Sequence, residues 1–198
     1  AEARTLARVR SPHVVALLDA QPRNQFIALS LCRGGNLRHA TRRGLFGQAD
    51  VPRVGAQLLA ALAAVRSAGA VHRDIKPVNI LVRAPGPGAA IALADFGLAL
   101  HDDAAAGLRA GTLRYLAPEL RDGAGRATPA SDLFSAGVVL LELALAPRPL
   151  PDVFDRLDAQ LNAAAHVPDG LADGWSDRLR QMLSARPDAR GLAEDRDG

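Results

Sequence analysis

The chain has 198 residues, 48% of them hydrophobic and 23% charged, which is typical of a soluble globular protein with one domain or two small ones. The net charge of +3 and the 4% of aromatic residues do not favour a nucleic-acid-binding surface. The longest apolar stretch, residues 136–146, is shorter than the roughly 20 residues of a membrane span, so we expect no membrane segment within this chain. Cys32, the one cysteine, cannot build a disulfide framework or a cysteine zinc site, which favours a cytoplasmic location. An anchor elsewhere in a longer parent protein remains open.

The first predicted elements are short. Residues 1–9 predict the end of a helix, because apolar residues lie three positions apart among charged ones before Pro12. The apolar runs 14–18 and 26–31 predict two strands, joined by a turn at residues 21–24.

A longer helix is predicted next. Asp50 is a suitable N-cap, and the apolar residues after it follow the helical period as far as Gly69. Residues 71–82 have no such period and carry His, Arg, Asp, Lys, Pro and Asn in close order, which is typical of a functional loop. Residues 80–82 and 91–93 predict a small strand pair around a Pro-Gly turn.

The rest of the chain is predicted to be mostly helical. Residues 98–128 carry little periodicity and many small residues, which predicts a long surface loop. Thr128 and Pro129 then open a second helix, which is apolar on most faces and therefore central to a core. Residues 152–195 predict short helices separated by proline and glycine. The order of elements indicates an α+β fold, with helices dominating from residue 50 onwards.

Four polar motifs follow one another along the chain. They are His72-Arg73-Asp74-Ile75-Lys76-Pro77-Val78-Asn79, Asp95-Phe96-Gly97, Gly111-Thr112 and Ala117-Pro118-Glu119. In this order they resemble the catalytic-loop, magnesium-binding and activation-segment motifs of the eukaryotic-like protein kinases. The resemblance covers nearly the whole chain and implies a protein-kinase-like fold with a mostly helical large lobe, residues 33–195. Residues 1–32 would be a remnant of the small lobe and hinge, with the end of helix C and two strands.

The resemblance implies specific chemical roles. Asp74 would accept or orient the proton of the substrate hydroxyl, and Lys76 would stabilise the transferred phosphate. Lys76 is the only lysine of the sequence, and this role would explain why a lysine is kept here. Chance survival of a single lysine is the alternative explanation. Asn79 and Asp95 would offer oxygen ligands to Mg²⁺. From the residues alone, Asn79 could instead cap a strand and Asp95 could start a turn. Pro77 directly after the lysine resembles the serine/threonine kinases rather than the tyrosine kinases.

The resemblance also implies where ATP binds. Adenine would lie against the segment that contains Leu29, Ser30 and Cys32, with Leu81 under the ring and Leu29 controlling access behind it. As a sequence, residues 26–32 are also compatible with an ordinary edge strand.

Other residues are expected to hold the architecture. Glu119 is expected to pair with Arg190, and Asp132 to hold the backbone of the catalytic loop. Thr112 is expected to bond to the catalytic residues, although an ordinary loop threonine remains the alternative. By the same resemblance, His72 is a packing residue rather than a general base. It would form a hydrophobic spine with Phe96, Leu6 and Leu17.

The resemblance begins late in the family's pattern. Glu2 lies where the family has the glutamate of helix C, whose partner is a lysine on an earlier strand. Neither that strand nor the glycine-rich loop precedes Glu2. We therefore expect a fragment of a longer kinase with little or no activity of its own. We also expect apolar surface exposed on residues 1–9, an open sheet edge and poor solubility.

Regulation is expected to be unusual. Residues 98–110 contain no Ser, Thr or Tyr, so phosphorylation there is excluded. In the family, the arginine that Arg73 matches meets a phosphate on this loop. We expect Asp102 or Asp103 to supply the negative charge instead.

These observations predict a bacterial serine/threonine protein kinase domain that transfers the γ-phosphate of ATP, with Mg²⁺, to Ser or Thr hydroxyls of protein substrates. Two alternatives remain open. One is a non-catalytic, pseudokinase-like binding module. The other is a small-molecule phosphotransferase of similar fold, which Ala117-Pro118-Glu119 disfavours because that motif belongs to kinases acting on proteins. The sequence does not indicate the physiological substrate or the oligomeric state.

Overall fold

A computed structural model of the chain describes residues 2–21, 26–97, 113–121, 125–150, 154 and 156–191. Its helices are α1 (Glu2–Leu6), α2 (Leu37–Arg42), α3 (Val51–Ser67), α4 (Pro129–Leu145), α5 (Leu157–Leu161) and α6 (Trp175–Met182). Its strands are β1 (Leu17–Gln21), β2 (Phe26–Leu29), β3 (Ile80–Val82) and β4 (Ile91–Leu93). The strands form two antiparallel hairpins, β1 with β2 and β3 with β4. The predicted α+β class is therefore confirmed.

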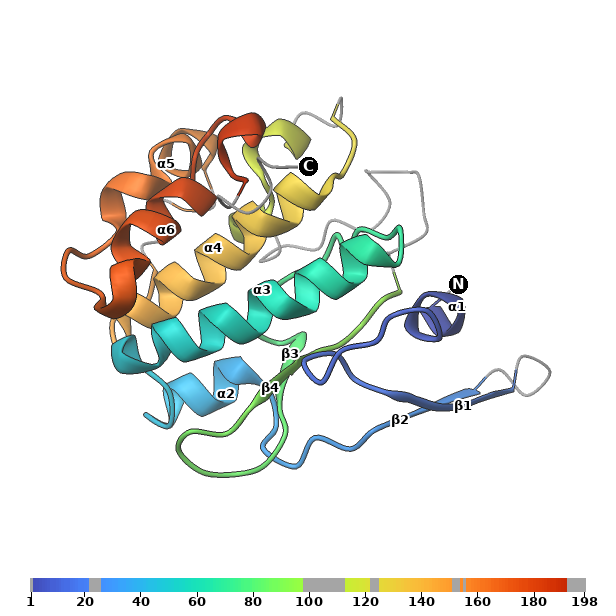
Figure 1. Cartoon of the computed structure of the whole chain (residues 1–198). Coiled ribbons are helices and arrows are strands. Elements are labelled where there is room, and N and C mark those ends of the chain that lie inside the picture. The colour runs from blue at the N-terminus through green and yellow to red at the C-terminus, as the bar shows by residue number, and fades with distance from the viewer. Residues whose placement is uncertain are drawn as a thin grey trace.

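The long helices form the body of the molecule. In Figure 1, α3 and α4 lie side by side, α5 and α6 gather beyond α4, and α2 lies with the β3–β4 hairpin on the other side of α3. The β1–β2 hairpin extends away from this body, with α1 beside it. The catalytic-loop motif follows α3 and leads into β3, so it lies between the helical body and the small hairpin.

Helix α4 is the centre of the core, as its all-round apolar pattern predicts. Phe134, Val138 and Leu140 are fully buried, and α4 contacts both α3 and α6. The helix begins at Thr128, whose side chain accepts a hydrogen bond from the backbone N–H of Ser131 at 3.3 Å. In the described part of the chain, no helix is long and apolar enough to cross a membrane.

Helix α3 covers one side of α4. It ends where predicted, because Gly69 after it has a φ of +70°, a left-handed conformation that favours glycine. Gly55 in its middle allows close packing, since a Cβ there would lie 2.1 Å from the Trp175 ring of α6. Asp50 occupies the predicted N-cap position, but its carboxylate accepts no backbone N–H of α3. It accepts instead the N–H of Gly47 at 3.0 Å and the side chain of Arg53 at 2.5 Å.

The small β3–β4 hairpin forms with the predicted bounds, pairing Ile80 with Leu93 and Val82 with Ile91. The strand predicted at residues 14–18 begins later, at Leu17, because the chain before it is bonded elsewhere. The N–H of Val15 donates to Leu93 O at 3.0 Å, so this segment lies against β4 instead of β2. The second predicted strand ends at Leu29 rather than at residue 31.

Two other predictions differ from the structure. Residues 113–121 are not a surface loop: they contain two short 3-10 turns, and Tyr115, Ala117 and Leu120 are buried. Helix α2 was not predicted, because a six-residue helix is too short to show a period. Its signal is the cap Asn36, whose side chain accepts from the backbone N–H of His39 at 3.0 Å.

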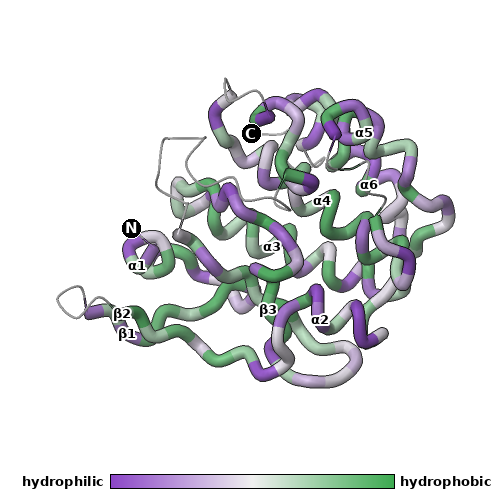
Figure 2. The backbone as a smooth tube through the Cα atoms, turned by 180° about the vertical axis from the view of Figure 1, so that it is seen from behind, coloured by the Kyte–Doolittle hydropathy of each residue, from purple (hydrophilic) through white to green (hydrophobic). Residues whose placement is uncertain are grey.

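Exposed apolar side chains lie on the β1–β2 hairpin and not on residues 1–9. On the hairpin, Leu18 is 67% exposed and Phe26 and Ile27 are also exposed, and Leu31, two residues after β2, is 76% exposed. Leu6 of α1 is only 4% exposed, so the expectation of an apolar surface on that helix is wrong. Figure 2 shows the hairpin as a largely hydrophobic ribbon that extends from the body.

Candidate active site

The catalytic-loop motif is held by α4. Both carboxylate oxygens of the buried Asp132 accept backbone N–H groups of the loop, from His72 at 2.7 Å and from Arg73 at 2.9 Å. Burial raises the pKa of Asp132 to about 6, and the two backbone hydrogen bonds partly oppose that rise. The strained φ of +72° at Arg73 shows that the loop is bent at this point. Asp132 therefore lies where it can hold the loop backbone, as expected.

His72 is fully buried behind the loop. Its Nε2 lies 3.0 Å from the carbonyl oxygen of Ala94, and its ring meets the Phe96 ring edge-on, with centroids 4.7 Å apart. Burial lowers the pKa of His72, so the ring is neutral and packed rather than placed as a base. Leu6 and Leu17 belong to the same apolar core, Leu17 at its edge.

Asp74, Lys76 and Asn79 form one hydrogen-bonded cluster. The Lys76 ammonium lies 2.7 Å from Asp74 Oδ2, and the side chains of the pair are only 19% and 10% exposed. Asn79 Nδ2 donates to the same oxygen at 2.9 Å and to the backbone oxygen of Asp74 at 2.8 Å. Both side-chain bonds reach Oδ2, which leaves Oδ1 of Asp74 to face another group.

Asp95 approaches this cluster from the end of β4. The N–H of Ala94 donates to the carbonyl oxygen of Asn79 at 2.9 Å, which holds the two segments together. Asp95 itself is exposed with a φ of +65°, and its charge acts on buried His72 together with those of Asp74 and Lys76. The structure thus brings the four side chains of the predicted site to one region.

The donor set fits a hard cation that keeps other ligands. Asn79 uses its amide nitrogen for Asp74, so its Oδ1 is the atom left for a metal, and Asp95 offers an exposed carboxylate. Two such oxygens suit Mg²⁺, which completes its octahedron with water and phosphate oxygens. Within the described ranges, no three His, Cys, Asp or Glu side chains lie close enough together to hold a metal ion by themselves.

Glu2 of α1 lies beside the second motif. Its Oε1 is 3.4 Å from the backbone nitrogen of Phe96, which donates this long hydrogen bond. The contact connects α1 to the segment that carries Asp95. Since Lys76 is the only lysine of the sequence, Glu2 cannot pair with a second lysine of this chain.

Glu119 and Arg190 form the expected ion pair at the far side of α4. Arg190 is fully buried, and its guanidinium binds both carboxylate oxygens of Glu119, at 2.7 and 2.9 Å. The same guanidinium donates to the backbone oxygen of Ser184 at 2.7 Å and lies over the Phe134 ring at 4.8 Å. This two-pronged geometry anchors the fourth motif, Ala117-Pro118-Glu119, to α4.

The segment expected to meet adenine follows β2. Leu29, Cys32 and Leu81 are partly buried at the edge of the core. Ser30 bonds to Ala16, the residue before β1: its N–H donates to the Ala16 carbonyl oxygen at 2.9 Å, and its hydroxyl accepts the Ala16 N–H at 3.0 Å. Burial raises the pKa of the Cys32 thiol.

Gly34 brings this segment close to the small hairpin. Its N–H donates to Val82 O at 2.9 Å, and a Cβ at Gly34 would lie 2.6 Å from Val82 Cγ1. The segment therefore lies directly against the strand that carries Leu81.

Thr112, Asp102 and Asp103 lie outside the described residues, so their expected roles stay predictions. The structure also shows a feature that sequence reasoning missed. Arg38 and Arg42 of α2, and Arg114 from a distant part of the chain, line one cavity next to Lys76. In a sequence with 24 Lys and Arg residues, no local pattern distinguishes these three.

A buried carboxylate paired with an ammonium, a neighbouring amide and a second carboxylate on the adjoining loop define the class of site: one suited to phosphoryl transfer. The chain belongs to the protein kinase domain family, which matches residues 1–194. It is 38% identical to the serine/threonine-protein kinase PknL of Mycobacterium tuberculosis, over 98% of this chain and 50% of that protein.

Two further relatives have similar coverage of this chain. A probable serine/threonine-protein kinase, pknA2 of Bifidobacterium longum, is 32% identical over 96% of this chain and 26% of its own length. The calcium/calmodulin-dependent protein kinase type II of Caenorhabditis elegans is 36% identical over 98% of this chain and 28% of its own. The chain thus spans half or less of these curated relatives.

Proposed function

We propose that this chain is the catalytic region of a serine/threonine protein kinase that transfers the γ-phosphate of ATP to Ser or Thr hydroxyls of proteins. The observation that carries the proposal is the cluster in which Lys76 and Asn79 both bond Oδ2 of Asp74 beside Asp95. The names of the relatives support the serine/threonine class, as does Pro77 after the lysine.

The proposal gives each group of the cluster a chemical task. Asp74 Oδ1, which accepts none of the bonds within the cluster, orients the acceptor hydroxyl and takes its proton as the phosphoryl group moves to that oxygen and ADP leaves. Lys76 neutralises charge on the transferred phosphoryl oxygens. Asn79 Oδ1 and the Asp95 carboxylate would hold Mg²⁺, which when bound neutralises the phosphates of ATP.

The expected nucleotide site follows from the same proposal. Leu29 and Cys32 with Leu81 supply apolar surface for the adenine, and the backbone around Ser30 supplies polar groups. Residues 1–32 would act as the small-lobe part and residues 33–195 as the large lobe. We extend the proposal to a cytoplasmic location for this region.

The first test is Mg²⁺-dependent binding of a fluorescent ATP analogue to the 198-residue chain. We expect tighter binding with Mg²⁺ than with EDTA, and Asp95→Asn should remove most of that difference. Asp158→Asn, an exposed carboxylate on α5, is the matched control and should retain it. Binding that ignores both Mg²⁺ and Asp95 would contradict the proposal.

A second measurement separates catalysis from binding. Because residues 1–198 alone are expected to have little or no activity, this test uses a longer protein that includes the chain. Transfer from γ-labelled ATP to a mixed protein acceptor, followed by phosphoamino-acid analysis, should give phosphoserine and phosphothreonine but not phosphotyrosine. Asp74→Asn should lower transfer by about 10²- to 10⁴-fold while leaving nucleotide binding within a factor of about three.

A non-catalytic binding module is the second candidate. One observation favours it: in the part of the chain that the structure describes, the Glu2 carboxylate accepts the backbone N–H of Phe96 beside Asp95. Nucleotide binding with no transfer, in this chain and in a longer protein that includes it, would support that candidate over the kinase.

A further inference from the structure

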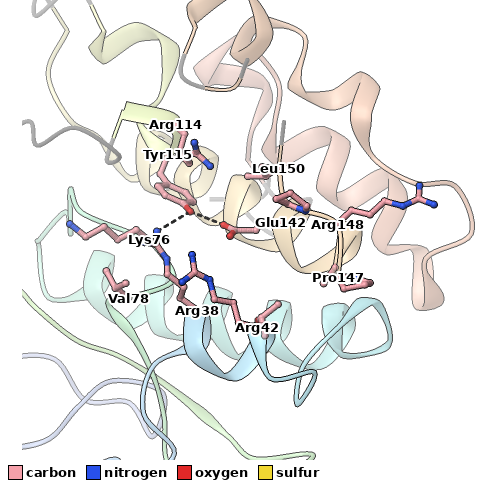
Figure 3. Close-up of a pocket in the computed structure, with 13 residues that line it drawn as sticks. Arg38, Arg42, Lys76, Val78, Arg114, Tyr115, Glu142, Pro147, Arg148 and Leu150 are labelled. Carbon is pink, nitrogen blue, oxygen red and sulfur yellow. Dashed lines mark hydrogen bonds between the residues drawn. The ribbon is translucent and has the colours of Figure 1, made fainter. Parts of the chain in front are cut away.

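A cavity of about 660 Å³ opens beside the proposed phosphoryl-transfer cluster. It lies between α2, the end of the catalytic loop, the turn that begins at Leu113, and the segment 146–150 after α4 (Figure 3). Its volume is within the range of sites that take a small ligand or a few residues of a peptide. We call it the basic pocket, defined by Arg38, Arg42, Lys76, Arg114 and Arg148.

The charge of the basic pocket is strongly one-sided. Five of its lining residues are cationic, and among the described residues that line it Glu142 alone is acidic. Arg38 and Arg42 are one helical turn apart on α2 and extend from it toward Tyr115 (Figure 3). Arg148 is exposed at the opposite rim, with its guanidinium directed away from Glu142.

The one carboxylate of the pocket is already engaged. The Tyr115 hydroxyl donates to Glu142 Oε2 at 2.6 Å, and Arg38 Nη2 donates to the same hydroxyl at 3.5 Å. Burial, with Glu142 close by, raises the pKa of Tyr115, so the hydroxyl stays protonated. Glu142 is therefore held by a neutral donor, and the pocket keeps an excess of positive charge for an anionic ligand.

The position of the pocket relates it to the acceptor. Lys76 lines one end of it, and the Lys76 ammonium is 2.7 Å from the Asp74 carboxylate. When the acceptor hydroxyl of a peptide reaches Asp74, a neighbouring residue of that peptide would therefore lie at the basic pocket. Extended chain covers about 3.3–3.6 Å per residue, so that neighbour lies only a few positions from the acceptor.

We propose that the basic pocket binds an anionic side chain of the protein substrate, a carboxylate or a phosphate a few residues from the acceptor hydroxyl. This inference rests on the proposed kinase function and adds a substrate class to it: acidic or already phosphorylated segments. Guanidinium groups suit both anions, because they pair with two oxygens at once.

The test compares matched fluorescent peptides by anisotropy with the 198-residue chain. Each peptide has one Thr, flanked by Glu, phosphoserine, Ala or Arg. We expect the Glu and phosphoserine peptides to bind at least tenfold more tightly than the Ala peptide, with the Arg peptide weakest and the preference falling as salt rises. If the phosphoserine peptide binds more tightly than the Glu peptide, phosphate is the main ligand of the pocket. If it binds equally or less tightly than the Glu peptide, the carboxylate is the main ligand. Both outcomes support the pocket.

Charge reversal shows whether the pocket is responsible. Arg42→Glu should remove the preference for acidic peptides and favour the Arg peptide. Arg43→Glu is the matched control, since Arg43 is adjacent and exposed but does not line the pocket, and the preference should persist within about twofold. Thermal melts of both variants check folding. Equal binding of all peptides, or the same loss in both variants, would overturn the inference.

The two proposals fail separately. Mg²⁺-dependent nucleotide binding without any charge preference among the peptides leaves the kinase proposal standing and overturns the pocket. An acidic preference that depends on Arg42, in a chain that binds no nucleotide, keeps the anion site and overturns phosphoryl transfer.

Discussion

The catalytic loop and the β1–β2 hairpin reverse the usual distribution of polar and apolar residues. In the loop region, His72, Asp74 and Asp132 are all less than a tenth exposed, whereas Leu18 on the hairpin and Leu31 just after it are 67% and 76% exposed. The loop is enclosed between α4 and β4, and the hairpin extends away from the body (Figure 1). In these two regions, burial therefore follows position relative to α4 more closely than hydropathy.

The difference has an energetic consequence. A buried polar group is costly when it loses its partner, since nothing replaces the missing hydrogen bond. A side chain that stays exposed contributes little to the free energy of folding, because folding removes little of its apolar surface from water. Substitutions in the buried polar framework should therefore destabilise the protein far more than substitutions on the hairpin.

The largest expected effect comes from the Glu119–Arg190 pair. Arg190→Ala removes a fully buried guanidinium that binds Glu119 and backbone oxygens, and we expect a loss of about 3–5 kcal/mol in the free energy of unfolding. Chemical denaturation measures it. Arg186→Ala is the control, because its pair with Asp188 is exposed, and it should leave stability unchanged. Equal effects of the two would show that burial does not decide the cost.

Asp132→Asn should have an intermediate effect. Asparagine keeps one acceptor oxygen, so either His72 or Arg73 loses the acceptor for its backbone N–H, at a cost of about 1–3 kcal/mol near neutral pH. Asp177→Asn on α6, whose side chain is 91% exposed, is the control for the same chemical change.

The effect of this substitution should also depend on pH. The pKa of Asp132 is about 6 in the folded protein, against an ordinary value of 3.8, so the folded state holds the proton more tightly. The wild type therefore gains stability relative to Asp132→Asn as the pH falls from about 6 to 4, and the gap between them widens. Denaturation at pH 7 and pH 4.5 measures this, and a constant gap would contradict it.

The smallest expected effect is on the hairpin. Leu18→Ser and Leu31→Ser should each change the free energy of unfolding by less than about 0.5 kcal/mol. Both should lower self-association measured by light scattering, since the poor solubility expected from the sequence would come from this surface. Leu58→Ala, at a fully buried position of α3, should cost about 2–5 kcal/mol, and comparable costs on the hairpin would remove the contrast.

Local patterns predicted much of the fold. The period of α3, the cap at Thr128 and the short β3–β4 pair were all evident in the sequence and are confirmed. Each depends on residues close together in the chain, where turn and cap chemistry act directly. Tyr115 was assigned to a surface loop because its burial comes from packing on α4, which no local pattern reports.

The sequence by itself determined the polar groups available for chemistry, because the motif from His72 to Asn79 is contiguous and Asp95 follows after one short hairpin. Only the tertiary structure decided what surrounds them. Arg38, Arg114 and Arg148 meet at one cavity because α2, the turn after residue 112 and the end of α4 pack together. Such long-range packing depends on the whole core, so the charge of a surface beside the site emerges only when the chain is folded.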